Sequence, residues 1–108
     1  MKYGLKSSTL QGIQNTLLQF SQIEEVILYG SRAMGNFKPG SDIDLAIIGK
    51  NLSHSKINQI SLKLDDLNLP YTFDICDFSK INNKDLINHI LNAGILFYKR
   101  KEVETAPN

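Results

Sequence analysis

Apolar residues recur along the chain with two different spacings, which predict helices alternating with strands. Spacings of three and four residues run through 8–20, from residue 53 or 55 to 67, and through 83–93, and each predicts an amphipathic helix. Short runs that are apolar or alternate with polar residues predict strands at 25–29, 42–48, 71–77 and 95–98, the last at a sheet edge. The expected fold class is α/β (α+β), a small mixed β-sheet flanked by helices.

Capping residues set the expected ends of the helices. Side chains that accept hydrogen bonds from free backbone N–H groups favour a helix start, and asparagine, proline or glycine favour an end. The expected caps are Ser8 with Gln11 in a capping box, Ser53 or Ser55, and Asn82 or Asn83 at the starts, and Asn68 before Pro70 and Gly94 at the ends.

The second and third expected strands carry different patterns. After Asp44 the second strand is apolar on both faces, which indicates that other layers cover both. The third strand alternates, with Tyr71, Phe73 and Ile75 on one face and Thr72, Asp74 and Cys76 on the other.

The candidate chemistry lies between the first two expected strands. Gly30-Ser31 ends the first apolar run, and Asp42 and Asp44 open the second. In a strand, side chains two residues apart point to the same face, so the two carboxylates project side by side. Their repulsion is relieved by a cation, and oxygen ligands favour Mg²⁺, Mn²⁺ or Ca²⁺. Asp42 and Asp44 are thus the candidate metal ligands.

The residues around Gly30 are candidates for binding nucleotide phosphates. Glycine lets the backbone turn sharply and approach a ligand, and the segment after it can begin a short helix with N–H groups directed at an anion. The nucleotide-binding candidates are Gly30, Ser31, Arg32, Lys38 and Ser41. The simpler alternative is a turn followed by solvated aspartates, since Asp is common at turns, although the joint spacing with Gly30-Ser31 disfavours it.

The pattern Gly-Ser, ten residues, Asp-x-Asp resembles the signature of the nucleotidyltransferase fold of the DNA polymerase beta superfamily. The form Gly-Ser-Arg-Ala-Met-Gly-Asn-Phe-Lys-Pro-Gly-Ser-Asp-Ile-Asp-Leu is similar to its minimal nucleotidyltransferase (MNT) branch, and the resemblance covers nearly the whole chain. Met34 departs from it, because many relatives carry a basic residue there. In that family a third acidic ligand comes from a neighbouring strand, which implies Asp74 here. An unpaired carboxylate in an apolar strand is costly, which favours Asp74 over Asp77 at the strand end.

The resemblance implies an enzyme that uses two Mg²⁺ ions and ATP as the nucleotide donor. It would transfer a nucleoside monophosphate, AMP, to a hydroxyl, with Asp42, Asp44 and Asp74 as catalytic and metal-binding residues. Similar proteins are commonly paired with a helical HEPN-type toxin, and the MNT member is the antitoxin, in some cases by AMPylating a toxin tyrosine. A steric antitoxin with weak or lost catalysis is the alternative. An aminoglycoside or other small-molecule nucleotidyltransferase is a third, to which the missing acceptor domain is the objection.

Length and composition limit the remaining possibilities. A chain of 108 residues with 42% hydrophobic content suits one core, and we expect a minimal nucleotidyltransferase domain at 1–101 and a flexible tail at 102–108. The net charge of +1 disfavours nucleic acid as a direct substrate. A single cysteine, no apparent signal region and no membrane-length apolar run favour a cytoplasmic protein without a membrane partner.

Three other residues invite functional interpretations that the sequence does not support. His54 and His89 have no second histidine or cysteine at ligand spacing, so we expect each to be a surface or packing residue. Cys76 has no histidine arranged for nucleophilic chemistry and is predicted to be a small buried hydrophobe.

Overall fold

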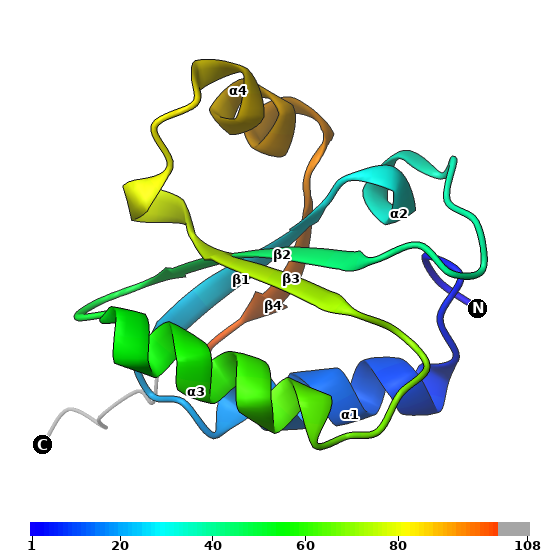
Figure 1. Ribbon diagram of the computed structural model, residues 1–108, viewed down its shortest axis with the longest axis horizontal. Helices are drawn as coiled ribbons and strands as arrows, with labels where there is room; N and C mark the ends of the chain where they lie inside the picture. Colours follow the sequence, from blue (N-terminus) through cyan, green and yellow to red (C-terminus); the bar gives the residue numbers. More distant parts are fainter. Residues whose placement is uncertain (102–108) are drawn as a thin grey trace, which may run out of the picture.

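The computed structural model describes residues 1–101, so the tail expected at 102–108 lies outside the described residues. In chain order the elements are α1 (Ser7–Leu18), β1 (Ile23–Tyr29), α2 (Ser31–Met34), β2 (Ile43–Gly49), α3 (His54–Asp65), β3 (Phe73–Asp77), the 3-10 helix η1 (Phe78–Lys80), α4 (Lys84–Ala93) and β4 (Ile95–Lys99) (Figure 1). Within residues 1–101, every helix is too short or too polar to cross a bilayer.

The strands form one mixed sheet in the order β3-β2-β1-β4. β1 pairs antiparallel with both β2 and β4, and β2 pairs parallel with β3. The parallel pair needs a crossover, which α3 supplies. The mixed sheet flanked by helices and the edge strand near the carboxyl end confirm the expected fold class.

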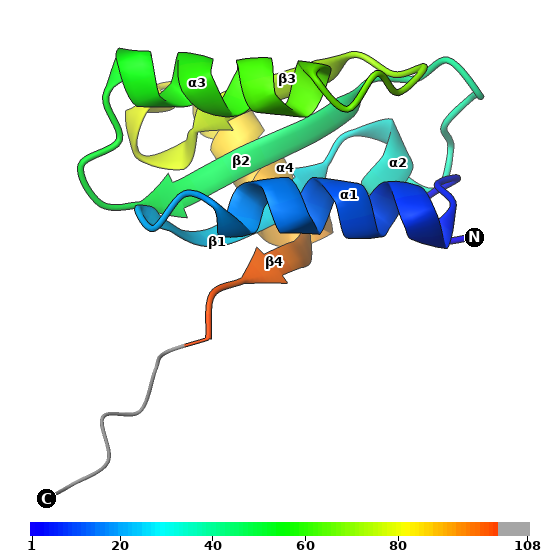
Figure 2. The same cartoon turned by 90° about the horizontal axis from the view of Figure 1, so that it is seen from below.

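Two helices cover one face of the sheet and form the main core. α1 and α3 contact each other and lie below the strands in Figure 1, and in Figure 2, the view from below, they run in front of the sheet. Alternate strand residues point into this layer, where the buried side chains include Ile13, Leu17, Val26, Leu28, Ile43, Leu45, Ile47, Ile60 and Leu64. Tyr71, Phe73 and Ile75 pack against the same cluster, which confirms the alternation predicted for the third strand.

α4 and η1 lie on the opposite face of the sheet (Figure 1). Their smaller cluster joins Tyr29 of β1, Ala46 of β2 and Ile90 of α4, with Cys76 of β3 partly buried against it. Leu45, Ala46 and Ile47 are all fully buried, so β2 is covered on both faces as its apolar sequence predicts.

The structure decides between the helix starts that the sequence left open. Ser53 caps α3, its Oγ accepting from Lys56 N at 3.0 Å, and Asn83 caps α4. The capping box expected at Ser8 is wrong: α1 begins at Ser7, and its cap position, Lys6, makes no side-chain hydrogen bond. Leu5 is fully buried just before it, so core packing sets where the chain enters this helix.

The end of α3 differs from expectation, whereas Gly94 caps α4 as predicted. α3 stops at Asp65, because the chain turns before Asn68, which has a left-handed φ of 54°. Gly94 does follow α4 directly, but with an extended backbone (φ −70°, ψ 153°) that continues into β4. A β-carbon at Gly94 would overlap Ile90 O and Ile27, so this glycine lets α4 pack closely on β1.

Candidate active site

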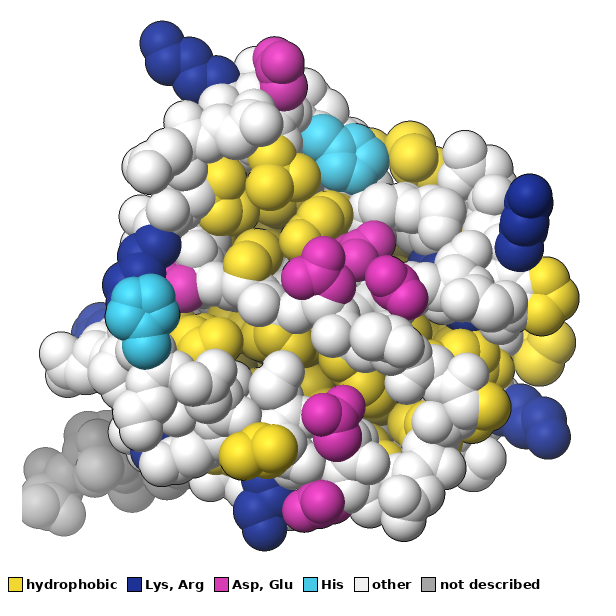
Figure 3. Space-filling model, viewed as in Figure 1, with side chains coloured by type: hydrophobic (Ala, Val, Ile, Leu, Met, Phe, Trp, Pro, Cys, Tyr) yellow, Lys and Arg dark blue, Asp and Glu magenta, His cyan; other side chains and the backbone are white. Residues whose placement is uncertain are grey.

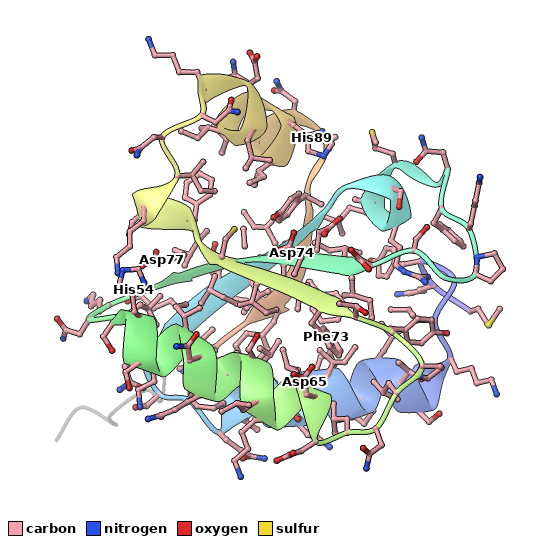
Figure 4. The ribbon with its side chains drawn as sticks, in the orientation of Figure 1. His54, Asp65, Phe73, Asp74, Asp77 and His89 are labelled. Carbon is pink, nitrogen blue, oxygen red and sulfur yellow. The ribbon has the colours of Figure 1, made fainter. Side chains whose placement is uncertain are left out.

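The strand register brings two of the predicted acidic residues together. In the sheet, Asp44 of β2 pairs with Tyr29 of β1 on one side and with Asp74 of β3 on the other. Asp42 precedes Asp44 by two residues, just before β2 begins. Figure 3 shows acidic side chains gathered at the centre of this face, and Figure 4 shows Asp74 on the side of α4 while Phe73 lies on the side of α1 and α3.

Asp44 is the carboxylate of this site whose pKa is raised by its surroundings. Its pKa is raised to about 6, first by desolvation and then by the charges of Asp74 and Asp42, while a protonated His89 would lower it. Asp42 and Asp74 are exposed. The expectation that Asp74 is costly within its strand is therefore wrong, because its side chain faces water rather than the apolar layer.

Gly30 turns the chain from β1 into α2 directly beside Asp44. Its backbone conformation (φ 76°, ψ −156°) is one that residues other than glycine rarely adopt. A β-carbon at Gly30 would overlap Asp44 Oδ2. Ser31 follows at the start of α2 and is partly exposed, so the candidate phosphate-binding turn lies in contact with the Asp44 carboxylate.

His89 joins this site, although its sequence context predicted only a surface or packing residue. Gly30 N donates to His89 Nε2 at 3.0 Å, and the imidazole lies edge-on to the Tyr29 ring at 6.1 Å between centroids. Figure 4 shows His89 at the end of α4 that faces α2. Ligand spacing could not reveal it, but antiparallel pairing of β4 with β1 brings the end of α4 to the end of β1.

Beneath the carboxylates, Tyr29 and Cys76 contact each other from β1 and β3. Tyr29 Oη lies 3.6 Å from Cys76 Sγ. Burial, followed by the contact with Cys76, raises the pKa of Tyr29 well above its ordinary range, and burial raises the pKa of Cys76. Both groups stay protonated near neutral pH, so neither provides a nucleophile here.

The structure buries the side chain of Arg32, one of the predicted nucleotide-binding residues. Its side chain is only 2% exposed and lies between the rings of Phe37 and Tyr71. The guanidinium donates to the backbone oxygens of Tyr3, Pro39 and Ser41 at 2.9–3.2 Å. Four of its five N–H donors thus hold the 35–42 turn and the amino-terminal segment in place.

The other predicted contacts lie on the same turn. Ser41 Oγ accepts from Lys38 N at 2.8 Å, so this hydroxyl stabilises the turn. The Lys38 side chain is exposed. Asp77, the rival to Asp74, accepts from Ser79 N and Oγ and caps η1, which agrees with the capping interpretation of a strand-end carboxylate.

The acidic group suits a magnesium ion that is shared with a substrate. Within residues 1–101, no group of three or more His, Cys, Asp and Glu side chains is arranged to hold a metal ion by itself. Mg²⁺ is commonly bound by one or two carboxylates together with substrate phosphates and water. Burial is the first cause of the raised pKa of Asp44, and repulsion from Asp74 and Asp42 adds to it. A cation would relieve that repulsion, so Asp42 and Asp44 fit this mode of binding.

Comparison with known proteins gives a consistent family assignment. The model of the family described as polymerase beta, nucleotidyltransferase, matches residues 11–103. A curated Methanocaldococcus jannaschii protein, whose name proposes a protein adenylyltransferase, is 29% identical over 79 residues, or 73% of this chain and 63% of that protein. The chain therefore spans less than two thirds of that relative's length.

Solved structures share the fold at low sequence identity. A chain from a toxin–antitoxin crystal structure with AMP-PNP has a TM-score of 0.68 and 17% identity, over 90% of this chain and 76% of that one. Another comes from a complex of a tri-AMPylated Shewanella oneidensis HEPN toxin with an MNT antitoxin, with a TM-score of 0.67 and 16% identity over 89% and 74%. At these identities the likeness establishes the fold.

Proposed function

Because the chain belongs to the polymerase beta nucleotidyltransferase family, we propose that it transfers AMP from ATP to a hydroxyl group. The observation that carries this proposal is the register of Asp44 with Asp74, beside the turn at Gly30. Carboxylates from neighbouring strands next to a glycine turn can bind a metal–triphosphate complex and position an acceptor.

Each residue of the site has a separate role in the proposed reaction. Asp42 and Asp44 would hold Mg²⁺, which when bound neutralises charge on the triphosphate. The Ser31 hydroxyl donates to a phosphate oxygen, and Asp74 accepts the proton of the acceptor hydroxyl. A bond then forms between the acceptor oxygen and the α-phosphorus, the bond from the α-phosphorus to the bridging oxygen breaks, and pyrophosphate leaves with that oxygen.

Lys38 is the remaining candidate for a cationic contact with the phosphates. Its side chain is exposed on the turn between α2 and β2, whereas the Arg32 guanidinium is buried. Ser41 supports the contact indirectly, because its hydroxyl binds the Lys38 backbone N–H.

The proposed acceptor is a hydroxyl on a small helical HEPN-type toxin, with this chain as its antitoxin. The support is the likeness to chains from toxin–antitoxin complexes, one of them containing an AMPylated HEPN toxin. A second candidate function is neutralisation of such a partner by binding alone. The exposure of Asp42 and Asp74 favours catalysis, since both are open to a substrate.

The decisive experiment incubates the protein with Mg²⁺, ATP labelled at the α-phosphate and a HEPN-type protein encoded beside it. Label transferred to the partner supports the enzyme, and we expect D42N and D44N to abolish transfer and protection from the toxin together. D65N, which changes an exposed carboxylate of α3, is the matched control and should retain both. Protection that persists in D42N and D44N, or no label in the partner, would support the steric alternative.

A further inference from the structure

His89 is held at one place by the packing of α4. The next residue, Ile90, is 1% exposed and belongs to the cluster with Tyr29 and Ala46. Ile90 O accepts from Gly94 N at 3.0 Å, where the helix ends against β1. A side chain one turn from such an anchored end has little freedom to move relative to the sheet.

The contact that His89 makes is a specific one. Gly30 N donates to Nε2, so this nitrogen carries no proton and the neutral imidazole has its proton on Nδ1. As the residue preceding the first turn of α2, Gly30 has an N–H group outside the helix's own hydrogen bonds. His89 supplies the partner that this backbone group needs.

Gly30 is thus confined from two sides. His89 holds its N–H, and the Asp44 carboxylate lies against its α-carbon. The backbone at Gly30 has a φ of 76°. An unrestrained glycine adopts many other backbone conformations about as easily as this one. The hydrogen bond to His89 selects this conformation, and the conformation sets where Ser31 lies relative to Asp44.

We propose that His89 is a positioning residue, which fixes the Gly30-Ser31 turn against Asp44 so that the triphosphate meets a preformed site. This inference rests on the proposed nucleotidyl transfer. His89 acts through the backbone of Gly30, and its effect on transfer comes from reduced freedom of the turn rather than from contact with the reacting atoms.

The alternative is that the imidazole only fills space beside Tyr29. The ring packs edge-on with an interplanar angle of 77°, and an apolar side chain of similar size would preserve much of that packing. The two explanations separate when the acceptor nitrogen is removed while the volume is kept. H89L does this, and H89Q replaces Nε2 by an amide that can again accept from Gly30 N.

The test compares H89L and H89Q with the full-length protein and with H54L, which alters an exposed histidine at the start of α3. We expect H89L to lower kcat/KM for ATP about tenfold, H89Q to recover most of it and H54L to match the parent. Thermal melting of each variant shows that it is folded under the assay conditions.

Hydrogen exchange at the Gly30 amide gives a readout that does not depend on transfer. We expect exchange to be slow in the parent and H89Q, and at least about tenfold faster in H89L. Unchanged exchange in H89L, or equal loss of kcat/KM in H89L and H89Q, would overturn the proposal. If the parent shows no transfer, the proposed function fails, and the affinity for AMP-PNP with Mg²⁺ across the same variants then decides the role of His89, with unchanged affinity in H89L overturning it.

Discussion

The carboxylate of Asp44 occupies the space in which a side chain at Gly30 would begin. G30A therefore has to displace Asp44 and strain a backbone with positive φ, and we expect it to lower the free energy of unfolding by about 2 kcal/mol. Nucleotidyl transfer should be lost as well, because the turn and the carboxylate separate. Urea unfolding and the α-phosphate label assay measure the two effects.

Gly40 provides the control for that substitution. A β-carbon there meets nothing within 4 Å, and no positive φ is involved. G40A should leave stability within about 0.5 kcal/mol of the parent and retain transfer. Equal effects of G30A and G40A would contradict the close contact between Gly30 and Asp44.

Arg32 is predicted to contribute to stability rather than to phosphate binding. R32M removes the N–H groups that donate to backbone oxygens in a buried site. We expect it to lower the free energy of unfolding by about 3 kcal/mol, and R32K to have an intermediate effect. K38M should alter stability by less than about 0.5 kcal/mol and instead weaken ATP binding. A stable R32M protein that fails to bind ATP would restore Arg32 as a nucleotide ligand.

The raised pKa of Asp44 predicts a pH dependence of stability in the metal-free protein. Asp44 ionises near pH 4 when unfolded but only at about 6 when folded, so its contribution to stability falls as pH rises from about 4 to 6. D44N removes that loss. Allowing for solvent screening, we expect it to be about 1 kcal/mol more stable than the parent at pH 7.5 and equal near pH 4.

Urea unfolding in EDTA at the two pH values measures this effect, with D65N as the surface control. If D44N has the same stability as the parent at pH 7.5, the carboxylate is not destabilised in the folded state. In that case, charge repulsion would no longer support cation binding at this position.

Ser53 and Ser55 provide a local test of the helix start. Ser53 Oγ accepts from Lys56 N, so S53A should lower the free energy of unfolding by about 1 kcal/mol. Ser55 lies inside α3, and S55A should have an effect of less than about 0.5 kcal/mol. If urea unfolding showed a larger loss of stability for S55A than for S53A, the helix start assigned to Ser53 would be wrong.

Local sequence patterns were sufficient for most elements of the fold. Alternation in the third strand and the three-to-four-residue stripes of the helices arise from which face is buried, a property encoded within each segment. Two helix boundaries differ from the local pattern, because α1 starts where Leu5 enters the core and α3 ends where the turn before Asn68 begins. Those limits depend on tertiary packing.

Site residues whose placement depends on one strand or turn could be predicted from the sequence. Asp42 and Asp44 share a face because of spacing alone, and Asp74 follows once β2 and β3 are paired in parallel. His89 requires the pairing of β4 with β1, which no local pattern specifies. The charge of Arg32 suggests a phosphate contact, but the position of its guanidinium depends on the Tyr71 ring and the Tyr3 carbonyl oxygen, which are distant in sequence.

The place of β1 between β2 and β4 affects how a newly synthesised chain matures. Until translation has passed His89, Gly30 lacks its contact from α4, and until it has passed Lys99, β1 exposes an unpaired edge. Nascent or prematurely terminated chains that end before α4 are then aggregation-prone and suited to capture by chaperones. In a growing chain, β1 therefore completes its pairing on both sides only after β4 has emerged from the ribosome.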